Sequence, residues 1–206
     1  MSARRWLSRL ILALALLAPP LVTPPVASAT VMVPVPLEDM VRDATAIVHA
    51  RVVRTGSRLV RDGDRTMPHT MTELEVIEWL SGSTGVRRIQ IDELGGTYPG
   101  GGVAIDGTPS YRVGDEVVVF LRTTSMGFRT MGMVQGQFVV RHGVPGTADV
   151  VVRDTSDIGM ATWEGGPMSV TEGGREQMEL ASFLAWIRGA VAQTIPGDGS
   201  STGGAR

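Results

Sequence analysis

Apolar and polar residues alternate along much of the chain beyond residue 45, as they do in β-strands that bury one face. A continuous apolar run at 116–122 instead predicts a strand that is buried on both faces. Residues 56–68 and 154–174 follow neither pattern and are predicted to be polar connections. The alternating segments, each predicted to form a short strand, are 46–55, 69–80, 86–92, 128–134, 137–141 and 148–153.

An open sheet of so many short strands would leave exposed edges, and closure into a ring removes them. The pattern therefore predicts a mainly β fold built on a small β-barrel. Two helical patterns flank it, a short one at 37–44 and an amphipathic C-terminal one at 175–193. We expect a single domain over residues 30–194 and a disordered tail at 195–206.

The first 29 residues have the three parts of a secretory signal peptide. Three arginines precede an apolar run at 10–18, and residues 27–29 (Ala-Ser-Ala) match the small-x-small pattern that signal peptidase cleaves. The run is too short to span a bilayer, which needs about 20 apolar residues. We expect cleavage between Ala29 and Thr30 and an exported mature chain, periplasmic or extracellular, with no integral membrane segment. The adjacent arginines leave twin-arginine export open as an alternative.

The composition excludes several kinds of chemistry. The chain has no cysteine, which excludes a disulfide scaffold, a thiolate metal site and a cysteine nucleophile. All 19 basic residues are arginine, which excludes Schiff-base chemistry, a Ser–Lys dyad and a phosphate-loop lysine. The formal net charge of −2 gives no electrostatic footprint for nucleic acid, so we expect no nucleic-acid partner.

The titratable residues give no catalytic pattern, and no familiar catalytic motif is present. His49, His69 and His142 lack the i, i+4 spacing of metal ligands and are interpreted as exposed side chains, although a zinc site assembled in space stays open. The neighbouring acids Asp62/Asp64 and Asp92/Glu93 are interpreted as solvated surface. We therefore expect no catalytic residue, no metal and no cofactor.

Two other patterns have an ordinary explanation. The glycines at 95–96 and 100–102 could form an anion-binding nest, but a strand rather than a helix follows, so we interpret them as a flexible hairpin. Met131 and Met133 belong to a scattered set of eleven methionines, which is more typical of core packing than of copper(I) binding.

Several motifs resemble, in order along the chain, those of a family of uncharacterised exported bacterial proteins. They lie at 43–52, 78–82, 95–96, 107–121 and 131–140, within the region 37–141. This resemblance supports export but implies no established activity.

The start of the expected mature chain resembles the start of netrin-like modules, of which the tissue inhibitors of metalloproteinases are the nearest. The residues concerned are Thr30, Val31, Met32, Val33 and Pro34, followed by a short helix and by residues 46–53. The resemblance implies an OB-like Greek-key barrel and an N-terminal wedge. In that wedge the amine and carbonyl of Thr30 chelate a protease zinc, and Val31 fills the specificity pocket. Thr30 and Met32 stand where those inhibitors have disulfide-bonded cysteines, so packing would have to hold the segment here.

These observations predict an exported, non-enzymatic binding protein with a protein partner. In the most specific version of this prediction, the partner is a secreted zinc protease. A chaperone-like partner role acting through the same N-terminus is a variant. The expected binding elements are residues 30–34, 56–68 and 95–106, and the alternative for residues 30–35 is an arm that simply packs on the barrel. An exported hydrolase using scattered acidic residues and an envelope structural protein remain as other classes.

Overall fold

The computed structural model describes residues 30–62, 64–82, 85–163 and 165–194. The predicted signal peptide and the predicted C-terminal tail lie outside the described residues. Within the described part of the chain, no helix combines the length and apolarity needed to cross a membrane.

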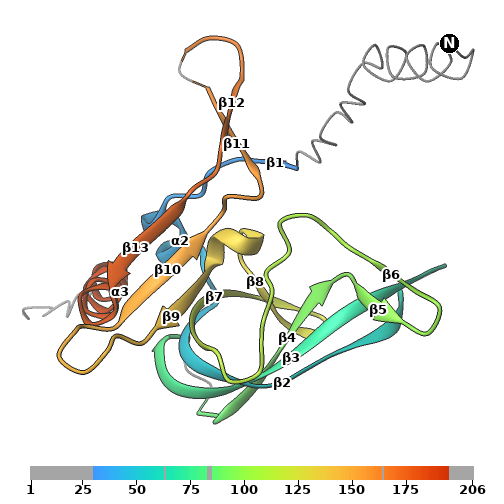
Figure 1. Cartoon of the computed structure of the whole chain (residues 1–206), viewed down its shortest axis with the longest axis horizontal. Coiled ribbons are helices and arrows are strands. Elements are labelled where there is room, and N and C mark those ends of the chain that lie inside the picture. The colour runs from blue at the N-terminus through green and yellow to red at the C-terminus, as the bar shows by residue number, and fades with distance from the viewer. Residues whose placement is uncertain (1–29, 63, 83–84, 164, 195–206) are drawn as a thin grey trace, which may run out of the picture.

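Five strands close into a ring, which is the centre of the molecule (Figure 1). Going round the ring, β2 pairs with β3, β3 with β4, β4 with β8, β8 with β7, and β7 again with β2; only the β4–β8 pair is parallel. This order of pairing makes an OB-like Greek-key barrel, so the predicted fold class is confirmed. The five strands are β2 (Ala46–Asp62), β3 (Arg65–Ser81), β4 (Arg88–Leu94), β7 (Glu116–Thr124) and β8 (Gly127–Thr130).

Strand β7 is buried on both faces, as its continuous apolar run predicts. Alternate residues of the strand serve two separate cores because successive side chains point to opposite faces. Val117, Val119 and Leu121 pack inside the barrel with residues of β2, β3 and β4. Val118 and Phe120 pack outside it, in the second core.

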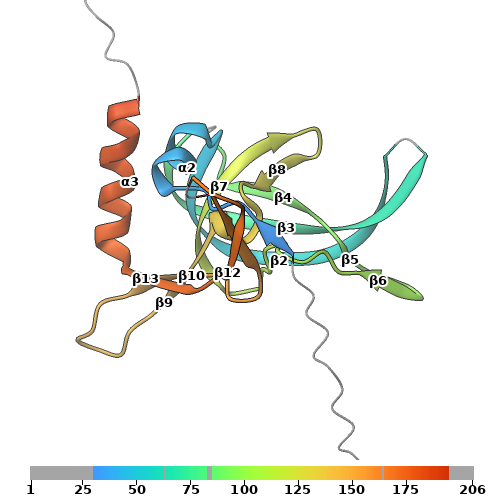
Figure 2. The same cartoon turned by 90° about the horizontal axis from the view of Figure 1, so that it is seen from above.

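The second core lies between an extension of the sheet and two helices (Figure 2). Beyond β7 the sheet continues through β9 (Gln137–Arg141), β10 (Val150–Asp154) and β13 (Arg175–Glu179). Phe138 of β9 packs between Phe120 and Phe183 with tilted rings, whose centroids lie 5.8 and 4.7 Å away. The helices that cover this core are α2 (Leu37–Asp43) and α3 (Leu180–Thr194), which confirms one short N-terminal and one C-terminal helix.

Two small sheets and a 3₁₀ turn complete the chain. A three-stranded sheet projects away from the barrel, where β11 and β12 form a hairpin and β1 pairs in parallel with β11 (Figure 1). A short hairpin of β5 and β6 lies against β2 and β3. The bounds are β1 (Val31–Met32), β11 (Gly159–Thr162), β12 (Ser169–Glu172), β5 (Gly96–Tyr98), β6 (Gly101–Val103) and η1 (Met133–Gly136).

Three sequence-based expectations about local structure are wrong, and in addition the strand expected at 128–134 ends at Thr130 and is followed by the 3₁₀ turn η1. Residues 56–68 are not a connection but the outer half of the β2–β3 hairpin, whose pairing continues to Asp62 and Arg65. Residues 154–174 contain the β11–β12 hairpin rather than an irregular loop. The C-terminal helix begins at Leu180, because Arg175–Glu179 pairs with β10 and its side chains form ion pairs with that strand. In all three segments polar or exposed residues occupy both faces, so no alternation marks the strand.

Candidate functional site

The N-terminal segment is an extended arm fixed to the body of the protein. The carbonyl oxygen of Thr30 accepts a hydrogen bond from the Gly159 N–H at 2.8 Å, and Val31 and Met32 pair with Gly159 and Met160. Gln135 holds the next residues, because its Oε1 accepts the Val35 N–H at 2.9 Å and its Nε2 donates to the Val33 carbonyl at 3.1 Å. The hydrogen bonds thus hold the arm in place without a crosslink.

The arm divides its side chains between the interior and the solvent. Met32 lies over Gly107, at the position that a side chain on this glycine would occupy. Val31, Val33 and Pro34 are exposed. Of the predicted binding residues, the structure therefore presents two valines and a proline at the surface and turns Met32 inward.

The exposed valines of the arm belong to a larger apolar surface on the projecting sheet. The side chains of Val31 and Val170 flank the same point above Gly159, so they share one face of the sheet. Trp163 comes directly after β11 and Met168 directly before β12, at even spacing from Ala161 and Val170, and both are exposed near the hairpin tip. We call this set the apolar face: Val31 (43% exposed), Val33 (57%), Trp163 (56%), Met168 (54%) and Val170 (47%).

Sequence reasoning identified the two valines of the arm but missed the three residues of the hairpin. It treated residues 154–174 as a loop and therefore assigned no role to Trp163, Met168 or Val170. The available signal was the Gly-Gly-Pro sequence at 165–167, a turn pattern that is compatible with a hairpin.

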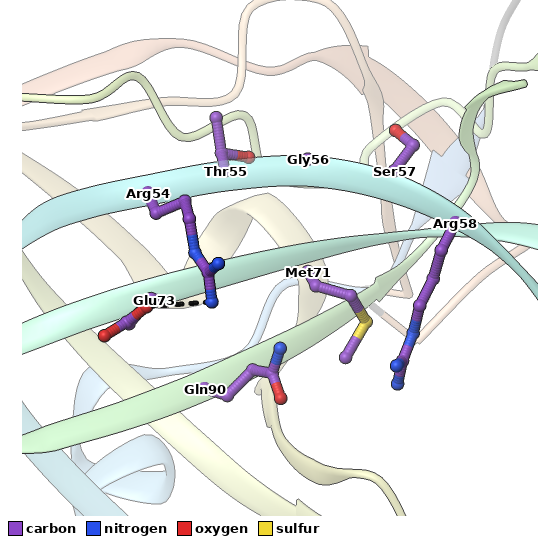
Figure 3. Close-up of a pocket in the computed structure, with 8 residues that line it drawn as sticks. All are labelled: Arg54, Thr55, Gly56, Ser57, Arg58, Met71, Glu73 and Gln90. Atoms are coloured by element: carbon purple, nitrogen blue, oxygen red, sulfur yellow. Dashed lines mark ion pairs between the residues drawn. The ribbon is translucent and has the colours of Figure 1, made fainter.

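A shallow groove crosses the outer side of β2, β3 and β4 (Figure 3). It encloses about 260 Å³, and it includes the start of the segment 56–68 that was expected to bind. Arg54 and Arg58 extend from β2 on either side of Gly56, while Met71 and Gln90 come from the neighbouring strands (Figure 3). Arg54 forms an ion pair with Glu73 at 3.1 Å.

A second hollow of about 490 Å³ lies beside the β5–β6 hairpin, in the other segment that was expected to bind, 95–106. Its lining includes apolar side chains such as Leu94, Val103 and Ile105 together with several threonines. The hairpin is closely packed on the barrel, since a side chain at Gly96 would collide with the hydroxyls of Ser57 and Thr70. The predicted hairpin is therefore present, and its base packs closely on the barrel.

The acids Asp92 and Glu93 are buried, which corrects their interpretation as solvated surface. Asp92 Oδ1 is 2.6 Å from His69 Nδ1, and its Oδ2 accepts from Arg129 Nη2 at 2.8 Å. His69 is itself buried, and its Nε2 has no hydrogen-bond partner within the described part of the chain. Asp92 is therefore held between two basic side chains.

Glu93 belongs to a different polar group. Its Oε1 accepts the Thr130 N–H at 2.8 Å, and the hydroxyl of Thr130 lies 2.5 Å from that of the buried Tyr111. Burial raises the pKa of Glu93 to about 7, although its hydrogen bonds with Thr130 act in the opposite direction. Because Asp92 and Glu93 are consecutive in β4, they point to opposite sides of the strand and cannot act together on one bond.

The other two histidines also pair with acids. His49 Nε2 is 2.7 Å from Glu116 Oε1 and is buried, so the interpretation of an exposed side chain is wrong for His49 as it is for His69. His142 is exposed, and its Nδ1 is 2.9 Å from Asp149, which raises the pKa of this imidazole. Among the residues that the structure describes, no three His, Asp or Glu side chains are arranged to hold a metal ion.

Comparison of the chain with protein-family models, with characterised proteins and with solved structures finds no match. The resemblance to netrin-like modules therefore remains a prediction. The function of the chain has to be inferred from the geometry of its own surfaces.

Proposed function

We propose that this chain is an exported, non-enzymatic binding module that recognises a protein partner through its apolar face. The observation that carries the proposal is the gathering of five large exposed apolar side chains on and next to one small projecting sheet. Single exposed apolar residues are common on proteins, but a group that includes tryptophan and methionine is typical of a protein interface. The arm and the hairpin come from distant parts of the sequence, and both contribute to this face.

The partner segment that fits best is an extended strand. Among the described residues β12 pairs only with β11, so the backbone groups on its other edge are available to a further strand. A strand added there would lay its alternate side chains beside Val170 and Met168. Main-chain hydrogen bonds would supply affinity, and the apolar face would supply selectivity.

The charge around the apolar face favours basic residues in the partner. Asp157 and Glu172 are exposed beside the sheet, and residues 155–174 contain no arginine. A segment with apolar residues at alternate positions and arginine or lysine at its ends is complementary to this arrangement. We therefore propose such a segment as the ligand.

A zinc protease inhibited through a wedge is the less supported form of the same proposal. The wedge needs the Thr30 carbonyl as a zinc ligand, and this oxygen already accepts the Gly159 N–H. The paired arm thus holds this carbonyl against β11 instead of presenting it at a free chain end. Strand addition uses an edge of β12 that has no partner among the described residues and leaves the arm in place.

The test uses the chain beginning at Thr30 and two synthetic peptides, one with alternating valines and arginine ends and one with glutamate ends. We expect the basic peptide to bind, as measured by fluorescence anisotropy, and Val170→Asp to abolish binding. Val144→Asp is the matched control, because Val144 is an exposed valine in a distant loop. Equal binding of both peptides, no binding of either, or unchanged binding by Val170→Asp would overturn the proposal.

A further inference from the structure

Gly56 lies within the 17-residue strand β2, where neither backbone conformation nor packing requires a glycine. Its φ angle is not among the positive values that favour glycine, and a Cβ atom placed there would meet nothing within 4 Å. Glycine weakens a strand because it has no side chain to pack and loses more conformational entropy on folding than other residues do. Glycine inside a strand marks a bulge, a tight bend or a site where a ligand approaches closely, and the register of β2 against β3 has no irregularity at Gly56.

The space above Gly56 is the groove of Figure 3. Met71 is the cross-strand neighbour of Gly56, and its side chain lies along the groove. Arg54 and Arg58 stand two residues away on either side, so all three positions belong to the same face of β2. The glycine thus leaves a notch between two arginines.

The notch carries an excess of positive charge, although the chain as a whole is acidic. Glu73 is the one carboxylate that lines it, and Glu73 is already paired with Arg54 at 3.1 Å and with Arg88 at 3.2 Å. Within the described residues, no carboxylate lies in ion-pair distance of Arg58. Guanidinium groups arranged in this way are suited to carboxylates and sulfates, which accept their paired N–H donors.

A ligand in this groove must be recognised by side chains. β3 is hydrogen-bonded on both sides in this region, to β2 and to β4, so the β3 floor of the groove offers a ligand side chains rather than free backbone groups. None of the described residues that line the groove is aromatic, whereas single-stranded nucleic acids are bound largely by stacking of bases on aromatic rings.

We propose that this groove binds an acidic oligosaccharide, independently of the apolar face. A sugar ring occupies the notch over Gly56 and Met71, and its acidic groups pair with Arg58 and Arg54. The amide of Gln90 faces the same groove and is suited to the sugar hydroxyls. The acidic group is a carboxylate or a sulfate, since both match the guanidinium.

The test titrates the chain beginning at Thr30 with oligogalacturonate, with a sulfated oligosaccharide and with a neutral oligogalactan at low salt, by calorimetry. We expect at least one acidic sugar to bind and the neutral one to bind at least tenfold more weakly. Whichever of the two acidic sugars binds identifies carboxylate or sulfate as the ligand group. Gly56→Leu, which fills the notch, and Arg58→Gln should each weaken binding at least tenfold.

Arg112→Gln is the matched control, since Arg112 is an exposed arginine away from the groove. Circular dichroism and thermal unfolding of each variant show whether the fold is retained, and Arg58→Gln keeps the test valid where Gly56→Leu does not fold. Absence of binding by both acidic sugars at millimolar concentration overturns the proposal. Equal binding of polyglutamate, or full binding by the Arg58→Gln variant, overturns it as well.

Discussion

The buried carboxyl of Glu93 should make the protein less stable as the pH rises from acid to neutral. Glu93 lies in the barrel strand β4, where burial raises its pKa from the ordinary 4.5 to about 7. In the unfolded chain the group ionises near its ordinary pKa, whereas the folded protein resists ionisation until near neutrality. Folding therefore becomes less favourable across the interval between these two values.

The sign and size of the effect follow from proton linkage. Below pH 4.5 the carboxyl is protonated in both states and has no effect on stability; above pH 7 it is charged in both, and the penalty is complete. A shift from 4.5 to about 7, at about 1.4 kcal/mol per pKa unit, amounts to roughly 3 kcal/mol of lost stability. Removing the charge should remove this loss.

The assay is urea unfolding of the wild type and of Glu93→Gln at a series of pH values from 4.5 to 8.5. We expect the difference in unfolding free energy to move in favour of the variant by roughly 3 kcal/mol between the ends of the series. Glu75→Gln is the matched control, a more exposed glutamate of the adjacent strand β3. A difference that stays constant with pH, or that moves in favour of the wild type, would refute the reasoning.

Three further predictions concern single positions. Gly56→Ala should raise the unfolding free energy by about 0.5–1 kcal/mol in urea, because alanine suits a strand interior better than glycine; a loss of stability would contradict the account of this position. Arg129→Met should cost about 3 kcal/mol, since it removes the arginine partner of the buried Asp92 and leaves only His69 beside it, whereas Arg188→Met, which breaks an exposed pair, should cost at most about 1 kcal/mol. One alanine added before Thr30 should leave peptide binding to the apolar face unchanged, and it would abolish inhibition of a zinc protease only if the wedge operates.

The barrel could be predicted from sequence because its strands separate a dry interior from an outer surface. Residues 46–55 and 86–92 alternate for that reason, and 116–122 does not because β7 lies between two cores. The strands that were not predicted do not separate a buried face from an exposed one. In the outer half of the β2–β3 hairpin and in β11–β12, both faces carry polar or exposed side chains, so their strands leave no periodic signal.

The candidate sites were less predictable, because they depend on pairing between distant strands. His69 and Asp92 meet only through the register of β3 against β4, and no spacing in the sequence encodes that register. Val31 was predicted as a binding residue from a resemblance. Its neighbour Val170 could not be predicted, because the two meet only through the pairing of the arm with β11. Gly56 looked like an ordinary loop glycine until its strand conformation was known.

The parallel pairing of β1 with β11 joins the beginning of the described chain to a hairpin near its end. Contacts between such remote segments form late in folding, because the chain between them must first be ordered. A nascent polypeptide that has not yet reached β11 has no hairpin on which the arm can dock. The partner-binding surface would then exist only on completed molecules, so truncated or half-folded copies could not compete for the same ligand.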